Sequence, residues 1–148
     1  GGPGRCPSAA GAAPVGGPQR CPSAARSGHT GRVFTLAQAR HLMATLRPRV
    51  DELIRLRADL AELRADLAGP GVSPLGGRAE VKALEARLHA VIEDLHQVDV
   101  QVKGIAPVLL DFPGERDGRP VLWCWLEGDT DVGWYHRVEC GFAGRRPV

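Results

Sequence analysis

The chain has 148 residues, a formal net charge of +2 and 43% hydrophobic residues, which suits one globular domain. It has no run of about 18 apolar residues and no signal-peptide core, so we expect no membrane-spanning segment. Its four cysteines lack a Cys-x-x-Cys spacing, which favours free thiols and a cytoplasmic location over a disulfide framework.

The first 33 residues are rich in Gly, Pro and Ala, contain no acid and repeat a decapeptide, GGPGRCPSAA at 1–10 and GGPQRCPSAA at 16–25. Such a segment cannot bury enough apolar surface to offset its ordering entropy, so we predict a disordered tail over 1–33. The tail contains four arginines, which leaves residues 34–148 with a net charge of −2. This acidic balance argues against a nucleic-acid-binding surface.

The first predicted helix begins at Thr35, because Thr35 and Gln38 have the spacing of a capping box. Apolar residues then recur at helical spacing, and Pro48 predicts either a kink or a short first helix. From Leu53 to Leu67 the leucines step by three and four residues, as in a coiled-coil seam.

A second helix is predicted over 78–98, where apolar residues again step by three and four. A Gly/Pro loop joins the two seams, so we expect an antiparallel hairpin over 35–98. The first arm is long for the sheet it could cover, and we expect its uncovered seam to meet a second copy in a homo-oligomer. The alternative is that the two seams cover each other. Glu93 and His96 match a Glu-x-x-His metal motif, but their heptad positions face solvent.

Beyond residue 98 the apolar pattern changes to alternation, which predicts a short strand broken by Gly104 and Pro107. An Asp-Gly turn at 117–118 precedes a predicted strand over 121–126, and a further strand is expected over 134–140, followed by a flexible end. We expect a β-meander over 99–148 whose apolar face rests on the early helix.

The predicted fold class is therefore α+β. A long antiparallel helical hairpin, coiled-coil-like in its seams, is followed by a small C-terminal antiparallel β-sheet. Residues 34–148 form a single domain in this prediction, and the tail over 1–33 lies outside it.

A candidate site lies in the last two predicted strands. If their hairpin is symmetric about Thr130, Cys124 lies opposite His136 on one face of the sheet. A Cys beside a His can be a nucleophile or a soft metal ligand. A register slip by one residue would separate the pair, and the alternative is an inert buried thiol near a hydrogen-bonded histidine.

Further candidate residues flank this pair. Asp111 is a candidate general base or orienter for His136; alternatively it caps a turn or pairs with Arg145. Arg145 could bind an anion or join the C-terminus to the acidic loop. Trp125 and Trp134 are candidate ligand-binding aromatics, although Trp-rich strands more often belong to a core.

A series of short motifs runs from the start of the first predicted helix to the C-terminal segment. They are Phe34-Thr35-Leu36, Val102-Lys103, Leu110-Asp111-Phe112-Pro113, Asp117-Gly118-Arg119, Cys124-Trp125, Trp134-Tyr135-His136 and Gly141-Phe142-Ala143-Gly144-Arg145. Taken together, these motifs resemble those of the DUF2203 family, small bacterial proteins with a domain of unknown function, over about residues 33–148. The family tends to have a basic residue, Leu, Gly and Glu after Cys-Trp, whereas this chain has Leu126-Glu127-Gly128-Asp129. The resemblance implies the same architecture and no particular reaction.

Two functions fit these observations. The first is a non-enzymatic, self-associating helical-hairpin protein that binds a partner or ligand through its C-terminal sheet, since no catalytic signature is recognisable. The second is a small enzyme, or a metal- or ligand-binding protein, that uses Asp111, Cys124, His136 and Arg145. The sequence specifies no cofactor, and Cys124 and His136 are the candidate metal ligands.

Overall fold

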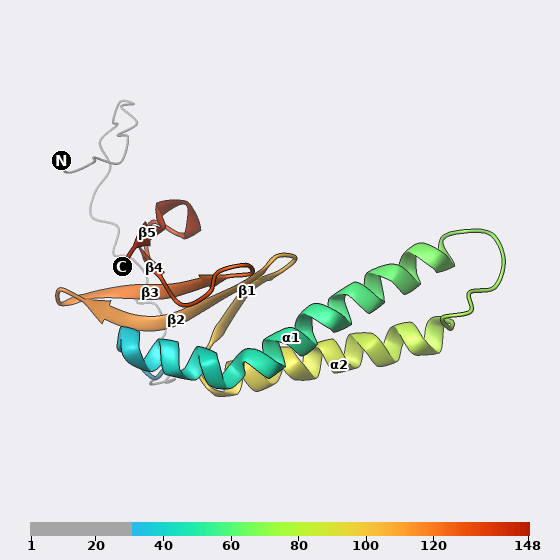
Figure 1. The fold of residues 1–148 in the computed structure, drawn as a ribbon, viewed down its shortest axis with the longest axis horizontal. Coiled ribbons are helices and arrows are strands. Elements are labelled where there is room, and N and C mark those ends of the chain that lie inside the picture. Colours follow the sequence, from blue (N-terminus) through green and yellow to red (C-terminus); the bar gives the residue numbers. More distant parts are fainter. Residues whose placement is uncertain (1–30) are drawn as a thin grey trace, which may run out of the picture.

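The computed structural model describes residues 31–148, so the predicted disordered tail lies outside the described residues except for its last three. The described chain is α+β: two helices are followed by a five-stranded antiparallel sheet (Figure 1). Its elements are α1 (Leu36–Leu67), α2 (Arg78–Gln97), β1 (Gln101–Ile105), β2 (Val108–Arg116), β3 (Arg119–Leu126), β4 (Trp134–Arg137), the 3-10 helix η1 (Phe142–Gly144) and β5 (Arg146–Pro147).

The start of α1 confirms the predicted capping box. The Gln38 amide donates to Thr35 Oγ1 at 3.1 Å, and the Thr35 amide donates to Gln38 Oε1 at 2.9 Å. The helix then runs through Pro48 to Leu67 without a break, so the short first helix is not formed. Figure 1 shows that α1 instead changes direction partway along its length.

The two helices form a hairpin in which their leucine seams face each other. Four leucines of the α1 seam are buried, and the α2 seam is buried or half-buried against them. These residues are Leu53, Leu56, Leu60 and Leu63 on α1 and Leu84, Leu88, Val91 and Leu95 on α2. An oligomer was expected because the α1 seam would be left uncovered. In the described part of the chain the two seams cover each other, so this argument for an oligomer is weak.

The sheet is a meander with the strand order β1-β2-β3-β4-β5. The predicted Asp117-Gly118 turn joins β2 to β3, and both residues have positive φ, at 52° and 72°, as a two-residue hairpin turn requires. Three predictions for this region were wrong. The strand expected to be broken by Gly104 runs through it to Ile105, with a register irregularity between Val102 and Gly104. The strand expected over 134–140 ends at Arg137, and the segment expected to be flexible contains η1 and β5.

One face of the sheet packs on α1, as predicted, and forms the core. Phe112, Trp123 and Trp125 lie on this face, in one cluster with Phe34 and several α1 side chains. The Trp123 indole donates to the Phe34 carbonyl at 2.8 Å. A Cβ on Gly114 would overlap that indole, so the close approach of the chain before α1 requires glycine there.

An ion pair fixes the far end of the sheet to α1. Arg57 of α1 donates to Glu127 at 2.5 and 2.8 Å and to the Ile105 carbonyl at 2.7 Å. Glu127 also accepts from the Val108 amide at 2.8 Å.

The face of the sheet opposite to α1 has no helix from the hairpin over it, and the C-terminal segment with η1 and β5 lies on that side (Figure 1). Among residues 31–148, no helix is long and apolar enough to cross a bilayer.

Candidate functional site

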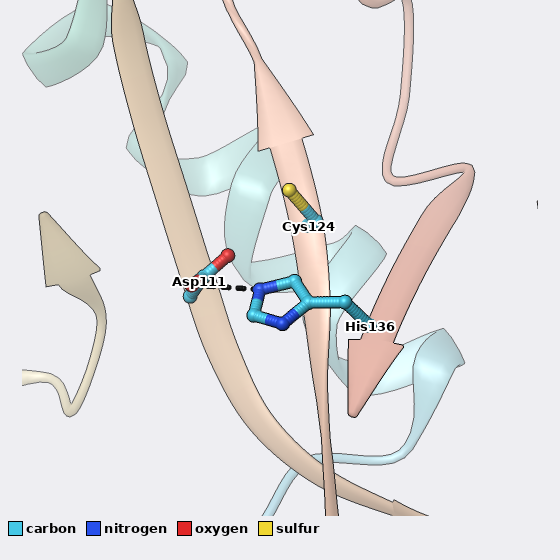
Figure 2. A group of neighbouring side chains, drawn as sticks. All are labelled: Asp111, Cys124 and His136. Atoms are coloured by element: carbon cyan, nitrogen blue, oxygen red, sulfur yellow. Dashed lines mark hydrogen bonds and ion pairs between the residues drawn. The ribbon is translucent and has the colours of Figure 1, made fainter. Parts of the chain in front are cut away.

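Three neighbouring strands bring three side chains together on the face of the sheet opposite to α1, which we call the outer face (Figure 2). Asp111 lies on β2, Cys124 on β3 and His136 on β4. Asp111 is directly opposite Cys124 in the β2–β3 register. Because successive residues of a strand point to opposite faces, this group is separated from the core residues Phe112 and Trp123.

The β3–β4 register differs from the expected one by two residues. Cys124 pairs with Trp134, and His136 pairs with Leu122, so the expected Cys124–His136 pairing is wrong. The shift is even, so both side chains still point to the outer face. The observed pairing is centred on Asp129, one residue before the assumed centre. The Asp129 amide donates to the Leu126 carbonyl at 2.8 Å, and its carboxylate accepts from the Leu126 amide at 3.0 Å.

The three side chains are almost fully buried, with exposed fractions of 1% for Asp111, 0% for Cys124 and 4% for His136. One donor atom from each lies within 4.8 Å of the others. His136 Nε2 is 3.1 Å from Asp111 Oδ2, and His136 Nδ1 is 3.1 Å from the Arg137 carbonyl. Asp111 and His136 are therefore in contact, and the role of Asp111 as a general base or orienter stays a prediction.

The surroundings of His136 limit which nitrogen can bind another group. The carbonyl of Arg137 only accepts hydrogen bonds, so Nδ1 must carry a hydrogen to satisfy it. The Nε2 contact with Asp111 Oδ2 at 3.1 Å is a hydrogen bond only with a hydrogen between the two atoms, and a metal ion that displaced this hydrogen would bind the Nε2 lone pair. Histidines that bind metals have this arrangement, in which the second nitrogen donates to a backbone carbonyl.

Cys124 is a thiol at neutral pH in this environment. Burial raises its pKa to about 12, and the neighbouring charge of Asp111 adds to the effect, whereas Arg145 opposes it. A thiol is a poor nucleophile, so the metal-free arrangement does not support the expectation of an activated cysteine. A metal ion would change this, because coordination removes the thiol proton.

Asp111 has one oxygen without a partner. Its Oδ1 is buried and accepts no hydrogen bond among residues 31–148. Leaving a buried acceptor unsatisfied costs about 1–3 kcal/mol. The Asp111 carboxylate, the Cys124 thiol and the His136 ring thus offer one oxygen, one sulfur and one nitrogen at one buried place, the ligand types that zinc prefers.

Arg145 does not pair with Asp111, so that alternative for Asp111 is wrong. Its guanidinium binds the Asp129 carboxylate and stacks over the Trp134 ring at 4.6 Å and the Phe142 ring at 5.5 Å. This contact joins the C-terminal segment to the acidic loop, which is one of the two alternatives expected for Arg145. Arg145 and Trp134 thus hold the C-terminal segment in place on the side of the outer face.

Trp125 lies away from the group. Its side chain is 1% exposed and belongs to the core under the sheet, and its indole donates to the Asp129 carbonyl at 3.0 Å. We therefore leave Trp125 out of the site. Glu93 and His96 are exposed on α2, separate from the three clustered side chains.

A groove of about 600 Å³ on the outer face reaches two of the three side chains. Asp111 and His136 are part of its lining, whereas Cys124, Trp134 and Arg145 are not. The sequence did not indicate the other residues that line this groove. Some of them alternate with Asp111 along β1 and β2, so they could have been assigned to the same face of the sheet. The other lining residues include Gln101, Lys103, Leu109, Leu122 and Phe142.

Comparison with curated proteins and with solved structures gave no match. A family model described as "Uncharacterized conserved protein (DUF2203)" matches residues 32–148. The match covers the helical hairpin, the whole sheet and the three clustered side chains. The chain belongs to the DUF2203 family.

Proposed function

We propose that this protein binds a divalent transition metal, with zinc as the first candidate, through Asp111, Cys124 and His136. The observation that carries the proposal is the buried convergence of one oxygen, one sulfur and one nitrogen donor within 4.8 Å, with Asp111 Oδ1 lacking a partner among residues 31–148. Zinc accepts these three ligand types, whereas calcium and magnesium prefer oxygen alone.

The distances require only a small adjustment. Zinc bonds of about 2.0–2.3 Å in a tetrahedral arrangement place the ligand atoms roughly 3.4–3.6 Å apart. The three donors are within 4.8 Å of one another, so a shift of about 1 Å per side chain is sufficient. His136 Nδ1 keeps its hydrogen bond to Arg137 throughout.

The charges also support the proposal. A zinc ion with one carboxylate and one thiolate forms a neutral group, which lowers the cost of burying each charge separately. Arg145 remains neutralised by Asp129 and does not oppose the ion.

Three protein ligands leave a tetrahedral zinc one open position, as in sites that bind a substrate or a water molecule. The groove on the outer face meets Asp111 and His136, so a small ligand could approach from this side. We therefore propose metal-dependent binding of a small molecule in the groove, by a small ligand-binding protein or enzyme.

Metal analysis of the purified full chain tests the proposal. Zinc-depleted protein reloaded with zinc should retain about one equivalent, and cobalt-loaded protein should show a thiolate-to-cobalt charge-transfer band. Both should disappear in C124S and H136Q. The matched control is C140S, because Cys140 is the other free cysteine among the described residues and lies outside the cluster. Equal zinc retention by C124S and the wild type would overturn the proposal, provided that circular dichroism shows both to be folded.

A second candidate function is self-association through the helical hairpin. It is supported by exposed apolar side chains at the end of the hairpin, Leu67, Val72 and Leu75. Since the seams cover each other, the contact is expected at this end and not along the helices. Sedimentation of the wild type and of L75D would test it, and a monomeric wild type at high concentration would exclude it.

A further inference from the structure

The face of the sheet toward α1 has a second unusual group, beyond the end of the helix. Near the turn between β2 and β3, Arg116, Arg119 and Arg137 surround Tyr135; we call these three arginines the arginine cluster. Together with Asp117 and Val121 they line a hollow of about 360 Å³. Figure 1 shows that this end of the β2–β3 hairpin projects past the start of α1.

The register places like charges next to each other. Arg116 is directly opposite Arg119, and Arg137 is opposite Val121, two residues further along β3 on the same face. Like charges in directly opposite positions destabilise a sheet. The packing of the fold does not require this arrangement, because Arg119 and Arg137 are exposed.

Counter-charges are scarce around the arginine cluster. Asp117 Oδ2 is 3.9 Å from Arg116 Nε, but its side chain is 92% exposed, so the pair contributes little. Within the described chain, Arg119 and Arg137 form no ion pair. The first turn of α1, which begins close to this hairpin, contains no acid either. The local field is therefore positive, although residues 34–148 have a net charge of −2.

Tyr135 holds part of the cluster in place. The Arg116 guanidinium lies 4.4 Å from the centre of the Tyr135 ring, which restricts its orientation. Arg146 is directly opposite Tyr135 in the β4–β5 register and adds a fourth positive charge beside the ring. The arginine forks are thus held on rigid strands, which lowers the entropy lost when they bind an anion.

We propose that the arginine cluster binds the phosphate group of a small phosphorylated molecule. Several guanidinium groups around one hollow suit a dianion with three or more acceptor oxygens better than a single carboxylate. Arg116 already covers one face of the Tyr135 ring, so a nucleobase would have to displace it in order to stack on that face. A compact phosphate is favoured over a nucleic acid, because the hollow is small and the surrounding domain is acidic.

This inference is independent of the proposed metal site. His136 and Arg137 are neighbours in β4, so their side chains point to opposite faces of the sheet. Loss of one site need not affect the other.

Titration of the full chain with inorganic pyrophosphate, followed by calorimetry and by NMR of the arginine side chains, tests the proposal. The wild type should bind with an affinity that falls as salt increases. The double variant R119Q/R137Q should bind at least about tenfold more weakly, because each lost guanidinium removes charge-assisted hydrogen bonds. The matched control is R55Q, since Arg55 is an exposed arginine on α1 without an ion pair in the described chain.

The stability of the double variant gives a second readout. Removing like-charge repulsion should leave its midpoint of thermal unfolding unchanged or slightly higher, and pyrophosphate should raise the midpoint of the wild type and of R55Q only. Equal weakening of pyrophosphate binding by R55Q, or no binding by the wild type, would overturn the proposal. Binding of single-stranded RNA that pyrophosphate cannot displace would overturn it in favour of a nucleic-acid surface.

Discussion

The two faces of the sheet are built in opposite ways. Toward α1, the strands present aromatic and aliphatic side chains that fill one core with the helix. On the outer face, no helix of the hairpin lies above the sheet, and yet Asp111, Cys124 and His136 are as buried as the core. Alternation along the strands produces this division, because each strand contributes to both faces at once.

The face toward α1 stabilises the fold, whereas the outer face holds the polar side chains of the candidate site. Apolar burial toward α1 provides the main driving force for folding. A buried polar group contributes little to stability unless every atom has a hydrogen-bond partner, and Asp111 Oδ1 has none within the described part of the chain. Changes on the two faces should therefore have different consequences, and the following variants test this.

The largest effect is expected for W125A on the face toward α1. Trp125 is 1% exposed, and its removal leaves a large cavity in the core. The free energy of unfolding in urea should fall by about 3–5 kcal/mol. The matched variant on the outer face, W134A, removes a side chain that is 36% exposed and should cost less than half as much. Equal losses would contradict the assignment of the core to one face.

Zinc should act through the outer face alone. At roughly 100 times its dissociation constant, zinc is expected to raise the free energy of unfolding by about 2.7 kcal/mol. V50A, a change in the core on α1, should lower the starting stability and keep this increment. C124S should lose the increment, and C140S should retain it. An increment that survives in C124S would place the ion elsewhere.

The stability contributed by the Arg57–Glu127 ion pair between α1 and the sheet should depend on pH. The hydrogen bonds from Arg57 and from the Val108 amide lower the pKa of Glu127 to about 2, so its stabilisation is complete above the unfolded-state pKa of about 4.3 and is lost as the pH falls through 2. E127Q should therefore be less stable than the wild type by about 1–2 kcal/mol at pH 7. Urea unfolding of both proteins at pH 7, 4 and 2.5 should show the gap narrowing. A gap that does not change with pH would contradict the ion pair.

The smallest effect is expected for H96A on α2. His96 Nδ1 is 3.9 Å from Glu93, and both side chains are exposed, so the variant should change the free energy of unfolding by less than about 0.5 kcal/mol. Zinc retention should also remain unchanged, which excludes the Glu-x-x-His pattern as the metal site.

Much of the fold could be predicted because it follows from local chemistry. The capping box at Thr35, the two leucine seams and the Asp117-Gly118 turn each depend on residues a few positions apart. The end of β4 and the presence of β5 could not be predicted in this way. β5 pairs Pro147 with Trp134, and Arg145 must fold back onto Asp129 for this to occur. The sequence suggested the contact of Arg145 with the acidic loop as one of two alternatives, but it has no local signal for the β4–β5 pairing.

Alternation along the strands predicted which side chains of the candidate site share a face, but it did not predict which residues pair across the strands. The assumed hairpin centre at Thr130 was wrong by one residue, so the pairing shifted by two, and Cys124 and His136 stayed on one face. An error of one in the pairing would have separated them. The contact between Asp111 and His136 crosses the middle strand, and the length of the imidazole makes it possible.

The hairpin also offers a place for an artificial attachment. Its closing loop, between α1 and α2, lies at the end of the hairpin remote from the sheet (Figure 1). Val72 in this loop is 98% exposed, so an inserted streptavidin-binding peptide there would disturb little packing. Purification or immobilisation through this point would leave the groove on the outer face and the arginine cluster accessible.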